Sequence, residues 1–151
     1  MRKLMSTLFV IMAAASVAMA ADKPDFTGDW KMDADKSSFG QMPPPASILA
    51  KIDHKDPALS ITTTQNDQTQ TFKYSTDGKE TTNSMMGNEM KSKAVWEGKT
   101  LVIASVANMG GVDLKVDSKY SLSDDGKTLT QALKIAAPQG EFEMSIVLVK
   151  Q

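Results

Sequence analysis

Apolar and polar residues alternate along most of this chain. Between Val112 and Leu122, apolar side chains occupy nearly every second position, and Asp or Lys fills most positions between them. A period of two places successive side chains on opposite faces of a β-strand. Together with 112–122, similar patterns predict about ten strands, the others at 27–33, 48–54, 59–64, 72–74, 79–85, 90–96, 101–107, 129–135 and 142–148. No segment shows helical spacing, so the chain is expected to be all-β.

Glycine-bearing turns separate these segments. Thr76–Lys79, Glu97–Lys99 and Asp124–Lys127 each place a Gly before a Lys, which is typical of tight hairpins because Gly adopts positive φ without a Cβ clash. The segment 101–107 is apolar on both faces, which predicts the most buried strand. Residues 35–47 contain three consecutive prolines, which cannot donate to a sheet, so this segment is expected to be a loop across one end of the fold.

Consecutive hairpins favour an up-and-down antiparallel meander. A flat sheet of that width would expose two long edges, and closure into a barrel removes them. The predicted fold is therefore a meander barrel of about 8–10 strands. An outer-membrane barrel is disfavoured, because such barrels need an apolar outer band. The positions expected to face outward here carry Lys51, Lys73, Lys91, Lys93, Lys115 and Lys119.

The first 20 residues have the pattern of a secretory signal peptide. Arg2 and Lys3 precede an apolar run, and Ala18-Met19-Ala20 supplies the small residues of a cleavage site. The run is shorter than the roughly 20 residues that a membrane-spanning helix needs. We therefore expect residues 1–20 to be removed, residues 21–151 to form a single domain, and the protein to be periplasmic or extracellular with no membrane span.

Composition excludes some classes of function. Without Arg2 and Lys3 the chain holds 15 basic and 18 acidic residues, a net charge of −3. This balance argues against a nucleic-acid partner, which requires a basic surface. The sequence contains no Cys. In an oxidising compartment its stability must then come from a packed core.

Few residues suggest catalysis or metal binding. His54 is the only His and lies in Asp53–Pro57, which is turn-like and expected to be solvated. We therefore predict no catalytic residue, no metal site and no cofactor. Methionine is enriched, with one local cluster at Met85, Met86 and Met90. Thioethers suit Cu(I), but methionines also line adaptable apolar pockets or simply occupy ordinary core and exposed turn positions, so all three interpretations remain open.

The segment Phe26-Thr27-Gly28-Asp29-Trp30-Lys31 resembles the Gly-x-Trp opening of the lipocalin and calycin group. The resemblance extends to the succession of strands over most of residues 25–150. It implies that Gly28 lets the chain cross the barrel floor and that Trp30 closes it beneath a basic side chain of the last strand. Lys150 is the available residue, where the family would place Arg. The resemblance also implies a barrel able to carry an apolar ligand.

The interior-facing positions support a cavity. They mix rings and aliphatic groups with small or polar side chains: Phe72, Tyr74, Trp96, Leu114, Tyr120, Thr63, Ala94, Ser118 and Gln131. Pockets typically combine apolar walls with a few polar groups. We predict that Phe72, Tyr74, Met90, Trp96 and Tyr120 bind a small, mostly apolar ligand without catalysis. The alternatives are an envelope interaction module with a filled barrel and, less favoured, a copper-handling protein; a cavity above roughly 300 Å³ would favour the binder.

Overall fold

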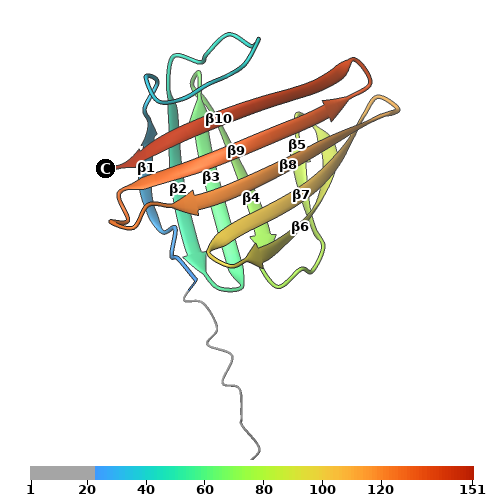
Figure 1. Ribbon diagram of the computed structural model, residues 1–151. Helices are drawn as coiled ribbons and strands as arrows, with labels where there is room; N and C mark the ends of the chain where they lie inside the picture. The colour runs from blue at the N-terminus through green and yellow to red at the C-terminus, as the bar shows by residue number, and fades with distance from the viewer. Residues whose placement is uncertain (1–22) are drawn as a thin grey trace, which may run out of the picture.

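Ten antiparallel strands form one sheet that curls into a nearly closed barrel (Figure 1). The computed structural model describes residues 23–151, so the predicted signal peptide lies outside the described residues. The strands are β1 (Gly28–Met32), β2 (Ile48–Lys55), β3 (Ala58–Gln65), β4 (Gln68–Ser75), β5 (Thr81–Met85), β6 (Asn88–Glu97), β7 (Thr100–Met109), β8 (Val112–Leu122), β9 (Thr128–Ala137) and β10 (Gly140–Lys150). The predicted all-β meander barrel is confirmed. Within the described range, no helix has the length and hydrophobicity to cross a membrane.

The first and last strands pair with each other. Trp30 of β1 lies opposite Ala50 of β2 on one side and opposite Lys150 of β10 on the other. From β10 the sheet continues through β9, β8, β7 and β6 to β5, and from β1 through β2 and β3 to β4. The two ends of the described chain therefore meet in the barrel wall.

Strands β4 and β5 face each other without a backbone ladder, and we call this junction the seam. The Asn83 side chain accepts a 2.7 Å hydrogen bond from the Lys73 N–H and donates a 2.9 Å bond to the Lys73 carbonyl. The Gln70 amide donates to the Ser84 carbonyl at 2.7 Å. The predicted hairpin at Thr76–Lys79 is thus wrong: the turn exists, but the Gly78 N–H donates to the Ala94 carbonyl of β6 at 2.9 Å and directs the chain away from β4.

Burial follows the predicted alternation. Along β2, Ile48, Ala50, Ile52 and His54 are buried while the residues between them are exposed. All six lysines predicted to face outward are exposed. The expectation for 101–107 is wrong, because β7 buries one face only and Val106 on the other is 42% exposed.

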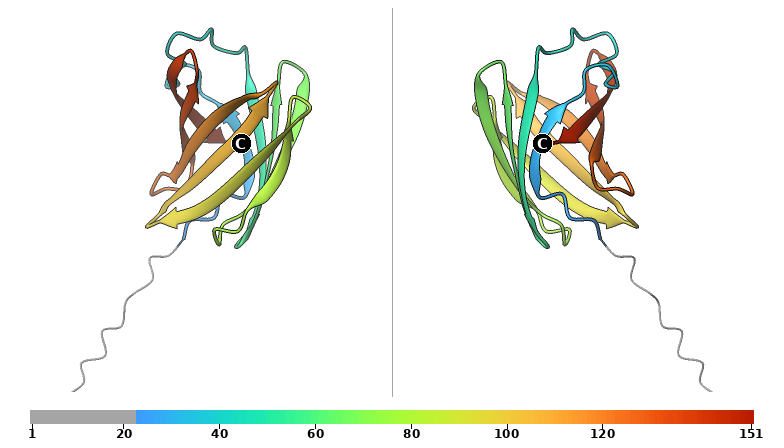
Figure 2. Two further views of the ribbon diagram at one scale, coloured as in Figure 1. Left: turned by 90° about the vertical axis from the view of Figure 1, so that its right-hand side faces the viewer. Right: turned by 90° about the vertical axis from the view of Figure 1, so that its left-hand side faces the viewer.

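The interior is solid at one end and hollow at the other. The most buried large side chains, Phe26, Trp30, Leu101, Ile103 and Leu129, belong to the solid end, which we call the floor. The connection between β1 and β2, including the Pro-rich segment 35–47, is a loop near the opposite end (Figure 2). Ser38 pairs with Ser145 of β10 through backbone hydrogen bonds of 2.7 and 2.8 Å. These bonds hold the loop against the barrel wall.

Candidate ligand cavity

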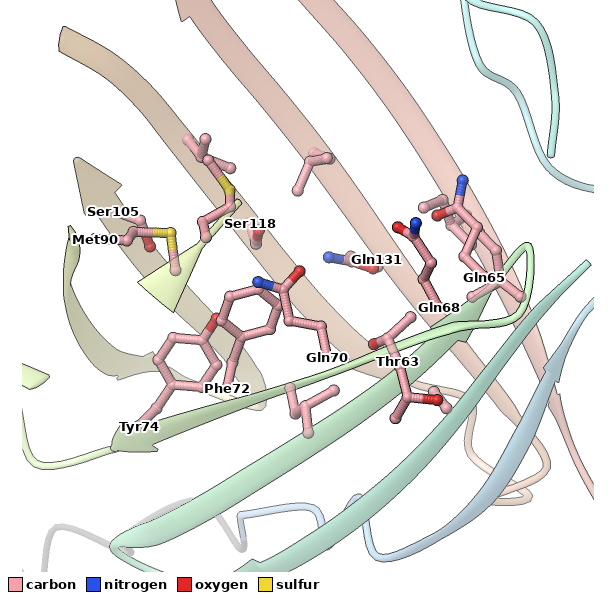
Figure 3. A pocket seen from close by; sticks show the side chains of 18 of the residues that line it. Thr63, Gln65, Gln68, Gln70, Phe72, Tyr74, Met90, Ser105, Ser118 and Gln131 are labelled. Atoms are coloured by element: carbon pink, nitrogen blue, oxygen red, sulfur yellow. The ribbon is translucent and has the colours of Figure 1, made fainter. Parts of the chain in front are cut away.

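The hollow half of the barrel is a cavity of about 1010 Å³ (Figure 3). Its lining includes Asn66 in the β3–β4 turn and Met86 and Gly87 in the β5–β6 turn, so these turns surround its mouth. Apolar side chains from β2, β3, β8, β9 and β10 form much of the wall: Ile48, Ile52, Ile61, Val116, Leu133, Ile146 and Leu148. The volume exceeds the roughly 300 Å³ at which a binder is favoured over a filled barrel.

Four of the five predicted pocket residues line this cavity: Phe72, Tyr74, Met90 and Tyr120. The Phe72 and Tyr74 rings of β4 stack with centroids 6.4 Å apart. Met90 and Tyr120 are 4% and 7% exposed, so both belong to the protein interior. Whether these side chains contact a ligand stays a prediction.

Trp96, the fifth predicted residue, lies elsewhere. It points inward but does not line the cavity; its ring packs in the floor, 5.7 Å from the Phe26 ring and 5.9 Å from the His54 ring between centroids. Its indole N–H donates to Asp56 at 3.3 Å. The physical reason is depth: Trp96 is near the floor end of β6, beyond Ala94, where Phe26 already fills the interior.

Polar side chains complete the cavity. Thr63, Ser118 and Gln131, which were predicted to face inward, line it together with Ser105. Gln65, Gln68 and Gln70 also line the cavity but were not predicted; in Figure 3 Gln65 and Gln68 lie near the β3–β4 turn, and Gln70 lies beside Phe72. The alternation in the sequence could have identified them, because they occupy every second position in line with the inward-facing Thr63 of β3 and Phe72 of β4. Burial raises the pKa of both Tyr74 and Tyr120, so their hydroxyls stay neutral.

The barrel floor contains both predicted structural residues. Trp30 is 1% exposed, and its indole N–H donates to the Phe26 carbonyl at 2.9 Å. The Lys150 ammonium lies 5.6 Å from the Trp30 ring centroid, within cation–π range. Gly28 has φ of +149°, and a Cβ there would lie 2.9 Å from Cε of Lys150. A larger residue would therefore be strained and would displace the lysine from the indole.

His54 is buried, not solvated as expected. The Phe26 N–H donates to Nδ1 at 3.2 Å, so the proton of the neutral ring is on Nε2, which donates to Asp56 at 3.0 Å. Asp56 also accepts a 2.5 Å bond from the Thr76 hydroxyl. Burial, the largest single influence, raises the pKa of Asp56, but the hydrogen bonds from Thr76, His54 and others outweigh it and hold the pKa below its ordinary value. This network orders the floor.

The methionine cluster lies at the mouth and wall of the cavity. Met85, Met86 and Met90 are all lining residues, but Met86 is 81% exposed whereas Met90 is buried. Among residues 23–151, no group of three or more His, Asp or Glu side chains is placed to hold a metal ion.

Several solved structures share this architecture. Zebrafish ileal bile acid-binding protein, in complex with cholic acid, aligns with a TM-score of 0.64 and 18% identity over 83% of this chain and 98% of that chain. The REP1-NXSQ fatty acid transporter aligns with a TM-score of 0.62 and 12% identity over 83% and 96% of the two chains. A secretory abundant heat soluble (SAHS) protein from Ramazzottius varieornatus gives 0.65 and 13% over 83% and 94%.

At sequence identities this low, the similarity to these solved structures establishes a shared fold and nothing more. No protein-family model matches the sequence, and no curated protein matches it. The chain has a lipocalin-like, calycin-type β-barrel fold, as its Gly28-x-Trp30 opening predicted.

Proposed function

We propose that this barrel binds a small, mostly apolar molecule in its cavity, without catalysis. The observation that carries the proposal is the cavity of about 1010 Å³, whose wall combines aliphatic and aromatic side chains with a comparable set of Ser, Thr, Asn and Gln side chains. That size is typical of small-molecule sites, and the apolar part of the wall suits an apolar molecule. Two structures of similar fold belong to proteins described as a bile acid-binding protein and a fatty acid transporter, which supports the same class of function.

The floor network does not favour catalysis. His54, the one His of the chain, has both ring nitrogens engaged with Phe26 and Asp56 and does not line the cavity. A general base must reach the proton that it abstracts from a bound substrate. We therefore assign His54 to the structure of the floor.

Filling the cavity tests the binding function. Ser118 of β8 is buried and lines the cavity, whereas Ser121 of the same strand is exposed on the outer face. The residue 21–151 protein should bind the uncharged dye Nile red saturably, with increased emission. Ser118→Phe should abolish this signal, and the matched control Ser121→Phe should leave it unchanged. Absence of saturable binding by the wild-type protein, or equal binding by both variants, would refute the proposal.

We also propose that the protein is exported and acts in the periplasm or outside the cell. The support is the basic, then apolar, then small-residue pattern of residues 1–20. Expression of the full chain in a bacterial host, followed by fractionation and mass measurement, should yield an extracytoplasmic protein that begins at Ala21. A full-length product retained in the cytoplasm would contradict the proposal.

A further inference from the structure

We infer that the ligand is an uncharged amphiphile, with a long apolar portion and a hydroxyl, ester or amide group, and not a carboxylate. The inference rests on the proposed binding function and narrows its ligand class. Its basis is that, among the described residues 23–151, none of those lining the cavity is Lys, Arg, His, Asp or Glu.

An anionic ligand would find no cation in this cavity. The only arginine of the sequence is Arg2, so residues 23–151 contain none. The predicted outward lysines are exposed on the other face of the barrel wall. At the floor, the Lys150 ammonium lies over Trp30, and His54 is engaged by Phe26 and Asp56. These positive or titratable groups are directed away from the ligand space.

A carboxylate that left water for this space would lose its hydration without gaining an ion pair. Burying an ionised group is costly unless it is paired and hydrogen-bonded, and the group tends to neutralise instead. Cholic acid and fatty acids, named for the two structural neighbours, both carry a carboxylic acid. The cavity described here offers such a group no cationic partner.

The polar groups present suit a neutral head group. Gln65, Gln68, Gln70 and Gln131 each offer an amide donor and an amide acceptor. The Tyr74 and Tyr120 hydroxyls, the titratable groups of the lining, stay protonated because burial raises their pKa. An alcohol, ester or amide can exchange hydrogen bonds with these groups at every physiological pH.

The test compares 1-dodecanol with dodecanoic acid, which have the same chain length, by displacement of Nile red from the residue 21–151 protein. Dodecanol should bind equally at pH 5.5 and pH 7.5, which also controls for titration of the protein. If only the protonated acid enters, dodecanoic acid should lose about tenfold in affinity per pH unit above its own pKa, up to roughly a hundredfold across this range.

A charge placed in the cavity should reverse this preference. Gln131→Arg should strengthen binding of dodecanoic acid at pH 7.5 at least tenfold and remove most of its pH dependence. Ala132→Arg, which adds the same charge at the next, exposed position of β9, should change neither.

The two hypotheses fail differently. Equal binding of acid and alcohol by the wild-type protein at pH 7.5, with no effect of Gln131→Arg, would overturn the neutral-ligand inference and leave the binding function intact. Failure of Nile red and both dodecyl compounds to bind would overturn the binding function itself, and the inference with it.

Discussion

Replacement of Trp30 by Ala should remove the main structural element of the barrel floor. The side chain is 1% exposed, donates to the Phe26 carbonyl at 2.9 Å and lies beneath Lys150. Truncating a buried Trp costs about 3–5 kcal/mol. The unpartnered Phe26 carbonyl adds about 1 kcal/mol. Because domains of this size are stable by only about 5–15 kcal/mol, the variant should be close to unfolding.

Thermal and urea unfolding, followed by far-ultraviolet circular dichroism, measure the effect. For a domain of this length the loss corresponds to a midpoint lower by roughly 10–20 °C. Trp30→Phe keeps a ring but removes the N–H donor, so it should cost about 1–2 kcal/mol. Leu49→Ala on the exposed face of β2, where Leu49 is 46% exposed, is the control and should change stability by less than about 1 kcal/mol.

A free energy of unfolding for Trp30→Ala within about 1 kcal/mol of the wild-type value would contradict a structural role of Trp30 in the floor. That result would mean that the surrounding floor collapses into the space, or that burial at this position contributes little.

Three further predictions follow from the floor, the cavity and its mouth. The pKa of Asp56 is lowered in the folded protein, so its stabilising contribution is full above about pH 4 and is lost as the pH falls below that value. Asp56→Asn should therefore reduce the acid-induced decrease in unfolding midpoint, and an unchanged pH profile would contradict this. Trp96→Phe should leave Nile red affinity within about twofold, because Trp96 does not line the cavity; a tenfold loss would place it in the site. Dialysis against a chelator should not change the thermal unfolding midpoint. If the protein instead binds stoichiometric Cu(I), and replacing Met85, Met86 and Met90 together by Ala removes that binding, the copper alternative is favoured.

The alternation in the sequence predicted most of the fold because a barrel buries one face of every strand. The same parity placed Phe72, Tyr74, Met90 and Tyr120 in the cavity wall. The alternation also gave the correct inward face for Trp96, but it does not give the depth of a residue along the barrel, and Trp96 lies in the floor. Depth depends on strand tilt and on how the first strand enters the floor.

Other differences arose from reading polarity as exposure. His54 continues the inward series of β2 but was assigned to a polar turn, because its partners Phe26 and Asp56 are recognisable only in the folded chain. Gln65 and Gln68 are both polar and exposed, yet they line the cavity because they lie at its mouth. The seam between β4 and β5 was missed because a Gly-Lys turn predicts a hairpin whether or not the following strand pairs.

The pairing of β1 with β10 has a consequence for when the barrel can form. Trp30, in the first strand to be synthesised, faces Lys150 in the last, so the floor cannot close until the final strand is available. Contacts between residues so distant in sequence make folding slow, because the chain must close a long loop before they stabilise it. If the chain is exported as we propose, this delay would keep the polypeptide unfolded during translocation across the membrane. The barrel would then close only after translocation.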